Sequence, residues 1–432
     1  MKRFATCLFL LTATAARAQP MDVYGFNPRS LAMGGVQAAS AKDFSAVYYN
    51  PALLREASFG LGVAYSRPFV GATATAEPQA WQTPVDPQLP PDYLGITTGF
   101  AVSVGGVLRG RLTAGVAAYI PKGHVFRSRL FDESTPTFYR YDSPPERLQL
   151  VLGLSARPVE WLSLGAGAQV LSNYGGVSTI TANLGTTGPG HVVDRTLDSE
   201  VTGEASPVVG LAVGPFHGAQ VLATWRGEHK TNFTMPIGVN MGAFGSIDVS
   251  VEGVMHYSPN TVVLGATTKL LSGRLELAAD VDYQQWSKAP PPVAVVNFTL
   301  PETLVSLGFN RDVVSRPVDM GFVDTFTPRL GAEWTPTDAY AVRLGYCFRP
   351  TMVPDQTGRS NFLDSNAHLV SAGVGVAFED PLGWAKRLWL EGAAQWTLLS
   401  QRQVTKQGVN ATPDYRFGGS LLDLTVAARY EL

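Results

Sequence analysis

The connections between alternating segments constrain the fold of this chain more than any other feature. Apolar and polar residues alternate with a period of two in many segments, which predicts β-strands. In the last segment, Leu424 and Val426 take one face, whereas Asp423 and Arg429 take the other. Alternation alone fits a soluble sandwich with an apolar core as well as a membrane barrel with an apolar outer wall.

The lengths of the connections favour the barrel, because short and long connections alternate strictly. The expected strands lie near 57–66, 95–107, 110–120, 146–157, 160–172, 205–214, 218–226, 261–270, 274–285, 327–335, 339–348, 367–378, 387–398 and 420–432. The long connections cover 67–94, 121–145, 173–204, 227–260, 286–326, 349–366 and 399–419. Short turns on one side and long loops on the other are typical of an outer-membrane barrel, and a compact soluble domain rarely holds so many long loops.

We therefore expect an all-β fold, a 14-stranded antiparallel transmembrane β-barrel formed by residues 57–432. Two of the long loops contain alternating pieces, Ile247–Val254 and Thr303–Phe309, which could form hairpins above the membrane. A barrel of sixteen strands therefore remains an alternative. Six tryptophans near expected strand ends suit an aromatic girdle at the membrane surfaces. They are Trp161, Trp225, Trp286, Trp334, Trp384 and Trp396.

The first 18 residues have the pattern of a secretory signal peptide. Lys2 and Arg3 precede a short apolar run, and residues 16–18 fit a small-residue cleavage site. The run is too short for a transmembrane helix. We expect export and insertion into the outer membrane of a Gram-negative bacterium.

Charge and cysteine usage exclude several classes of partner and cofactor. The formal charge of −2 becomes −5 when Lys2, Arg3 and Arg17 are removed with the signal peptide, which argues against nucleic acid. Cys347 is then the remaining cysteine, so an internal disulfide is excluded. The six histidines are scattered along the chain, and we expect neither a metal nor a cofactor.

Residues 19–56 precede the first expected strand and are too apolar for a solvated tail. Asn50 and Pro51 favour a turn that would end a helical stretch. This segment is therefore interpreted as a plug folded inside the barrel. Deleting residues 19–52 would then leave a leaky barrel.

Several motifs together resemble the FadL/TodX family of outer-membrane transporters for hydrophobic compounds. The resemblance is carried by residues 30–35 (SLAMGG), 45–52 (SAVYYNPA), 279–287 (ADVDYQQWS), 329–334 (RLGAEW) and 342–346 (VRLGY). It implies a fourteen-stranded barrel, an N-terminal hatch of short helices in the lumen, and fatty acids or aromatic hydrocarbons as cargo. The hatch motif carried over is Asn50, Pro51 and Ala52. The expected partners are a hydrophobic ligand, outer-membrane lipid and the barrel-assembly machinery, and we expect a monomer.

Small inward residues suggest where cargo could pass. Family resemblance implies a side window at the third strand, here 110–120, and we expect a lateral exit at Gly115, Ala117 and Pro121. Glycine in mid-strand often marks a bulge or bend. The same small residues could instead make room for the hatch. Apolar hatch residues would hold the cargo before release. They are Phe44, Val47, Tyr48 and Leu53.

The opposite wall of the expected barrel carries charges of both signs, which could pair across neighbouring strands. We expect Glu333 and Arg343 to form such a pair and to help hold the hatch.

Other functions compete with transport of hydrophobic cargo. An enzyme would need a serine, a histidine and an acid brought together, and the sequence contains neither G-x-S-x-G nor H-E-x-x-H. We therefore expect no enzyme. A general porin would need an open, charged lumen, which the apolar plug opposes. Surface recognition by the long loops stays an alternative.

Overall fold

The computed structural model describes residues 25–36, 41–74, 86–105, 110–123, 133–141, 147–183, 193–240, 245–315, 319–381, 383, 386–408 and 412–432. Its helices are α2 (Pro28–Ala32), α3 (Ala46–Tyr49), η1 (Pro51–Leu53), η4 (Leu271–Gly273), η5 (Trp286–Lys288) and α4 (Glu302–Val305). No helix in these ranges is long and apolar enough to span a membrane.

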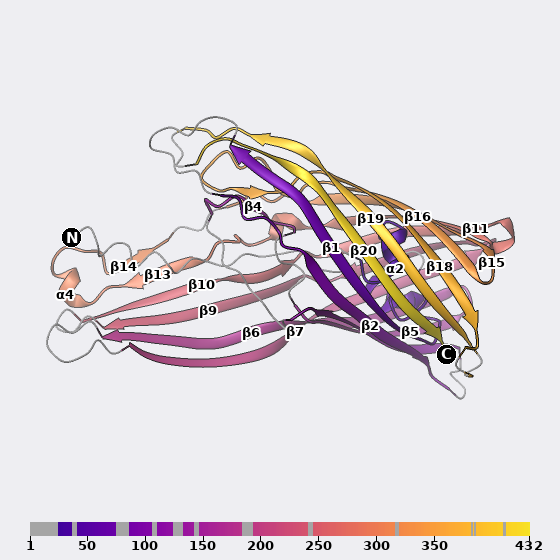
Figure 1. Cartoon of the computed structure of the whole chain (residues 1–432). Coiled ribbons are helices and arrows are strands. Elements are labelled where there is room, and N and C mark those ends of the chain that lie inside the picture. Colours follow the sequence, from indigo (N-terminus) through magenta and orange to yellow (C-terminus); the bar gives the residue numbers. More distant parts are fainter. Residues whose placement is uncertain are drawn as a thin grey trace.

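Within these residues, fourteen strands close into an antiparallel barrel (Figure 1). In barrel order they are β1 (Ser58–Ala74), β2 (Tyr93–Ser103), β3 (Leu112–Pro121), β5 (Gln149–Val159), β6 (Leu162–Asn183), β7 (Val193–Phe216), β8 (Ala219–Arg226), β11 (Thr261–Leu270), β12 (Leu275–Gln284), β15 (Thr325–Thr337), β16 (Tyr340–Arg349), β18 (Ala367–Glu379), β19 (Arg387–Val404) and β20 (Tyr415–Glu431). Pairing of β1 with β20 closes the barrel. The predicted fold class and strand number are confirmed.

The apolar faces of the strands point outward and the polar faces point into the lumen. On β20, Leu424 and Val426 are exposed, whereas Asp423 and Arg429 are buried. On β12, Leu277 and Val281 are exposed, and Asp282 is fully buried. A soluble sandwich would have the reverse arrangement, so the lipid-facing barrel is the one observed.

Exposed aromatic side chains lie near both ends of the barrel wall, as expected for a girdle. Trp161 lies 6.5 Å from Phe216 on the side of the short turns. Trp396 stacks on Phe69 at 6.4 Å towards the long loops. The prediction for Trp286 is wrong, because this side chain is 1% exposed and packs inside the lumen. Trp384 lies outside the described residues.

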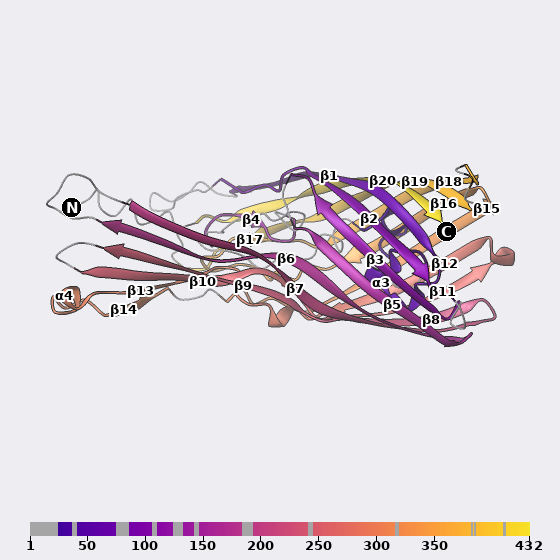
Figure 2. The same cartoon turned by 90° about the horizontal axis from the view of Figure 1, so that it is seen from below.

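Six further strands of the described residues lie outside the barrel. Strand β9 (His229–Asn240) pairs with β10 (Ser246–Ser258), which pairs with β13 (Val295–Thr299), which pairs with β14 (Asp312–Val314). These four strands, with the distal ends of β6 and β7, form an extension beyond the barrel mouth (Figures 1 and 2). Strands β4 (Thr137–Phe138) and β17 (Phe362–Leu363) form a separate parallel pair.

Several loops expected from the sequence are longer than the loops in the structure, because the strands beside them continue past the membrane. Strands β6 and β7 pair as far as Ala182 and Val193, inside the expected loop 173–204. The alternation at Ile247–Val254 does belong to a hairpin, β9–β10. The piece Thr303–Phe309 does not form a strand, since it starts within α4 and ends in a turn. These hairpins stay outside the barrel, so the strand number is not sixteen.

Candidate functional site

The lumen is occupied by an N-terminal segment, residues 25–36 and 41–56, which we call the hatch. Every residue of α2, α3 and η1 is buried. Asn27 caps α2 by accepting a hydrogen bond from the Ser30 nitrogen at 2.7 Å, and Pro28 opens the helix. Pro51 similarly opens η1, whose cap is Asn50. Short capped helices suit a space too narrow for longer ones.

The Asn50-Pro51-Ala52 motif docks on the wall formed by β5 to β8. The Asn50 side-chain oxygen accepts a hydrogen bond from the Ala52 nitrogen at 3.0 Å. Its side-chain nitrogen donates to the carbonyls of Leu211 and Ala223, at 3.4 and 3.5 Å. Because these carbonyls belong to paired residues of β7 and β8, Asn50 joins the hatch to the seam between two strands.

Glycines in the wall allow the hatch to approach the backbone closely. Among the described residues, nine wall glycines have a hatch atom as the first neighbour that an added Cβ would meet. They are Gly60, Gly99, Gly115, Gly153, Gly165, Gly210, Gly331, Gly345 and Gly373. At Gly165 the added Cβ would lie 2.1 Å from the Ala52 nitrogen, which is closer than atoms approach.

On the β1–β5 side the hatch packs through apolar side chains. Phe44 lies over Gly60 and Gly99, and Val47 lies against Gly115 together with Leu54. Strand β3 pairs with both neighbours without a register shift, so the bulge expected at Gly115 is absent. The glycine instead makes room for two hatch side chains.

Towards the short turns, ion pairs hold the hatch to β12, β15 and β20. Arg29 lies 2.9 Å from a Glu333 oxygen and 3.4 Å from a Glu276 oxygen. Burial alone would lower the pKa of Arg29, but these two carboxylates outweigh burial and raise it. Asp43 lies 3.3 Å from Arg429. Ion pairs thus hold the hatch at β12, β15 and β20, whereas its contacts with β1, β2, β3 and β5 include large apolar side chains.

Glu333 also pairs with Arg343 at 2.6 Å, as expected from the sequence. Arg343 in turn lies 2.7 Å from Glu391, and Glu391 lies 3.6 Å from Arg429. Charges therefore follow one another across β15, β16, β19 and β20. This chain of ion pairs connects the two places at which the hatch is held.

A narrow cavity of about 40 Å³ lies on the loop side of α2. Its wall combines guanidinium groups with apolar side chains, and one carboxylate borders it. The charged residues are Arg226, Asp282, Arg329 and Arg349, and the apolar ones include Leu31, Tyr49, Val263, Cys347 and Leu369. Arg329 pairs with Asp282, whereas Arg349 donates to the Tyr141 hydroxyl at 3.1 Å. A cavity of this size and lining suits the polar head of an amphiphile, whose apolar body would lie outside it.

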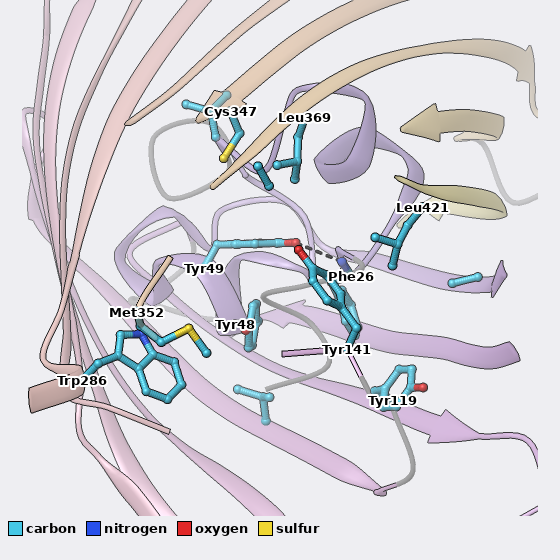
Figure 3. Packing of buried hydrophobic residues seen from close by; sticks show 14 of the residues in the cluster. Phe26, Tyr48, Tyr49, Tyr119, Tyr141, Trp286, Cys347, Met352, Leu369 and Leu421 are labelled. Atoms are coloured by element: carbon cyan, nitrogen blue, oxygen red, sulfur yellow. Dashed lines mark hydrogen bonds between the residues drawn. The ribbon is translucent and has the colours of Figure 1, made fainter. Parts of the chain in front are cut away.

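Large side chains outside the barrel strands cover the hatch on the side of the long loops. Trp286, Tyr141 and Met352 face Phe26, Tyr48 and Tyr49 of the hatch (Figure 3). The Phe26 nitrogen donates to the Tyr49 hydroxyl at 3.0 Å. Arg226 lies over the Tyr48 ring at 5.0 Å. In the described ranges, no cluster of three or more His, Cys, Asp and Glu residues is arranged to hold a metal.

A family model described as outer membrane protein transport protein (OMPP1/FadL/TodX) matches residues 8–384. The chain belongs to this family. No curated protein matches it in sequence. Members of the OMPP1/FadL/TodX family are transport channels for hydrophobic compounds in the outer membrane and are not enzymes.

Solved structures of the family share the fold at low sequence identity. A Pseudomonas aeruginosa FadL homologue is similar with a TM-score of 0.60 and 15% identity, covering 97% of this chain and 99% of that one. The P. putida toluene transporter TodX gives a TM-score of 0.58 and 13% identity, over 95% and 99%. The monoaromatic hydrocarbon channel CymD gives 0.52 and 13%, over 94% and 97%.

The structure brings together some of the residues singled out in the sequence. Asn50, Pro51 and Ala52 lie in one docked motif. Phe44, Val47, Tyr48 and Leu53 are all buried, but none of them lines the lumen cavity. Tyr49, which sequence reasoning left out, does line it. The arginines of the cavity were missed as a group, because they come from β8, β15 and β16, and only the barrel order brings them together.

Proposed function

We propose that this family member transports amphiphiles with a long apolar chain and an anionic head, such as long-chain fatty acids. The observation that supports this proposal is the lumen cavity, where three arginines lie beside apolar side chains of the hatch and wall. A guanidinium group matches a carboxylate in shape and charge. Because three arginines and one carboxylate border the cavity, an anionic head matches its charge better than a neutral hydrocarbon does.

We further propose that residues 19–56 form a plug and that residues 1–18 are removed on export. The apolar chain of the cargo would rest against the hatch side chains Phe44, Val47, Tyr48 and Leu53. A general porin is less well supported, because these side chains fill the space that water would need.

Release is proposed to be lateral, past β3 at Gly115, Ala117 and Pro121. The support is the asymmetry of the hatch contacts. At β3 the hatch meets the wall through Val47 and Leu54, which can separate from Gly115 without breaking an ion pair. On the other side, separation would leave Arg29 and Glu333 buried without each other, which is costly.

Binding of a labelled long-chain fatty acid to the detergent-solubilised protein tests the cargo. Arg349→Met should weaken binding of the acid about tenfold or more, and binding of the alcohol of equal length much less. Arg387→Met, in an exposed position near the short turns, is the matched control. Equal affinity for acid and alcohol in the unaltered protein would overturn the proposed head group.

Two disulfides test the route of release, in a Cys347→Ser background. Val47→Cys with Gly115→Cys would lock the hatch to β3, and Val36→Cys with Gly331→Cys would lock it to β15, since both pairs are in contact. We expect the first lock to abolish fatty-acid uptake until a reductant is added, and the second to leave uptake intact. Loss of uptake in both, or in neither, would contradict release at β3.

A further inference from the structure

The far end of the extension carries an exposed apolar cluster that the transport path does not use. It lies in residues 301–314, which we call the tip, where α4 and β14 end the extension away from the C-terminus (Figures 1 and 2). Its side chains are largely exposed: Leu307 is 69%, Phe309 59%, Val314 55% and Val313 46% exposed. Soluble surfaces rarely gather large apolar side chains in this way without a partner.

The tip is raised well above the barrel mouth. It is attached through β13 and β10, and the neighbouring strand β9 has 12 residues. A strand of this length spans about 40 Å. The tip is therefore too far from the lipid-facing wall to belong to the apolar band that the membrane of the cell itself covers.

Apolar side chains are exposed on both faces of the tip. Val313 lies opposite Phe298, so the two share one face of the sheet, and Val314 points to the other face. Leu307 and Phe309 lie in the turn between α4 and β14. A folded protein partner would cover one face of such a hairpin, whereas a fluid apolar phase would surround both.

The polar groups of the tip are mostly satisfied within it. The backbone nitrogens of residues 304–309 all donate to carbonyls of residues 301–305. Glu302 and Arg311 form an ion pair, and Asp312 accepts a hydrogen bond from the Thr299 hydroxyl at 3.1 Å. Internal hydrogen bonding is what entry into an apolar medium requires of a backbone.

The tip also continues into the apolar face of the extension. A row of apolar residues crosses four paired strands, from Val313 through Phe298 and Val249 to Ile237. Val293 packs against this cluster and also against the lumen cluster that contains Trp286. An apolar contact made at the tip is therefore structurally continuous with the cover of the lumen.

We propose that the tip inserts into a lipid surface outside the cell, so that the transporter makes contact with an apolar phase in addition to its own membrane. Because the tip holds two acidic groups and one basic group, insertion would not depend on anionic lipid. Zwitterionic vesicles are therefore the appropriate probe.

The test is flotation of phosphatidylcholine vesicles with the full-length protein held in nanodiscs. We expect the unaltered protein to float with the vesicles, and Leu307→Asp with Phe309→Asp to reduce the floating fraction about tenfold or more. The control carries Leu89→Asp with Val323→Asp, two exposed apolar positions away from the tip, and should float unchanged. A second variant of the tip carries the milder changes Leu307→Ser and Phe309→Ser. Its folding is checked by heat-dependent gel mobility, so that a loss of flotation is not confused with a folding defect.

Three results would overturn the proposal. The unaltered protein could fail to float, both double aspartate variants could float alike, or the tip variant could instead lose a self-association that the unaltered protein shows without vesicles. The last result would assign the tip to a second copy of the chain. Because the test uses no cargo, its outcome is independent of the proposed fatty-acid transport.

Discussion

At the scale of single residues, the wall glycines decide how the hatch fits. Sequence reasoning identified small inward residues at Gly115 and Ala117 and left open whether they serve cargo or the hatch. The structure places hatch atoms against nine of the wall glycines. Which glycines face the hatch cannot be read from sequence, because the contacts join positions up to hundreds of residues apart.

Replacing wall glycines by alanine should destabilise the protein in a set order. Gly165→Ala should cost most, because its Cβ would meet backbone atoms of Pro51 and Ala52. Gly210→Ala should cost less, about 1–3 kcal/mol, since the Asn50 side chain can move at the loss of its hydrogen bonds. Gly71→Ala is the control, because nothing lies within 4 Å of its added Cβ.

Calorimetric melting temperatures in one detergent would measure this series. If Gly165→Ala and Gly71→Ala have the same melting temperature, the hatch does not pack closely against β6 at this point.

At the scale of elements, alternation predicted the barrel strands well and the extension poorly. All fourteen barrel strands lie at or near their expected positions, because lipid on one side and a polar lumen on the other impose a period of two. The extension lacks that constraint, so β6 and β7 were ended too early. The alternating piece Thr303–Phe309 forms α4 and the turn after it, between the paired strands β13 and β14, since a single helical turn and a short strand share the same few apolar residues.

The base of the extension contains a buried histidine pair that should respond to acid. His229 of β9 and His256 of β10 are each 1% exposed, with ring centroids 5.6 Å apart. Burial lowers the pKa of His229 to about 4, and Arg147, which precedes β5, adds to this. Glu204 of β7 lies 3.9 Å from the ring but is partly exposed.

Because the folded pKa of His229 lies below the usual 6.5, its contribution to stability is present above pH 6.5 and is lost as the pH falls towards 4. The loss should reach about 3 kcal/mol. Melting temperatures at pH 7.5 and pH 4.5 should differ more for the unaltered protein than for His229→Phe, which keeps a ring. His217→Asn, in the exposed β7–β8 turn, should behave as the unaltered protein does. Equal acid sensitivity in His229→Phe would assign the effect to other groups.

At the scale of the whole molecule, the barrel and the hatch depend on each other. The inner wall carries charges that no lipid could accept, and the hatch satisfies part of them through Arg29, Lys42 and Asp43. The sequence predicts a charged wall that helps hold the plug, but not which hatch residues pair with it. Those partners follow only from the closed barrel order, which brings Glu276, Glu333 and Arg429 around one segment.

Removing the hatch should therefore convert a closed transporter into an open channel. Without residues 19–52, the lumen would lose Phe44, Val47 and Tyr48, and the remaining wall charges, such as Arg329, Glu333 and Arg343, would be hydrated. Water can satisfy these groups, so the barrel should still insert, because its strand pairing is independent of the hatch. In planar bilayers the deleted barrel should conduct small ions several-fold better than the full-length protein.

The triple variant Asn50→Leu, Arg29→Met and Asp43→Asn, which keeps the hatch but weakens its attachment, should show intermediate or flickering conductance. A deleted barrel that inserts, as judged by heat-dependent gel mobility, yet conducts no more than the full-length protein would mean that the wall closes without the hatch. The hatch would then be a part of the cargo site and not a plug.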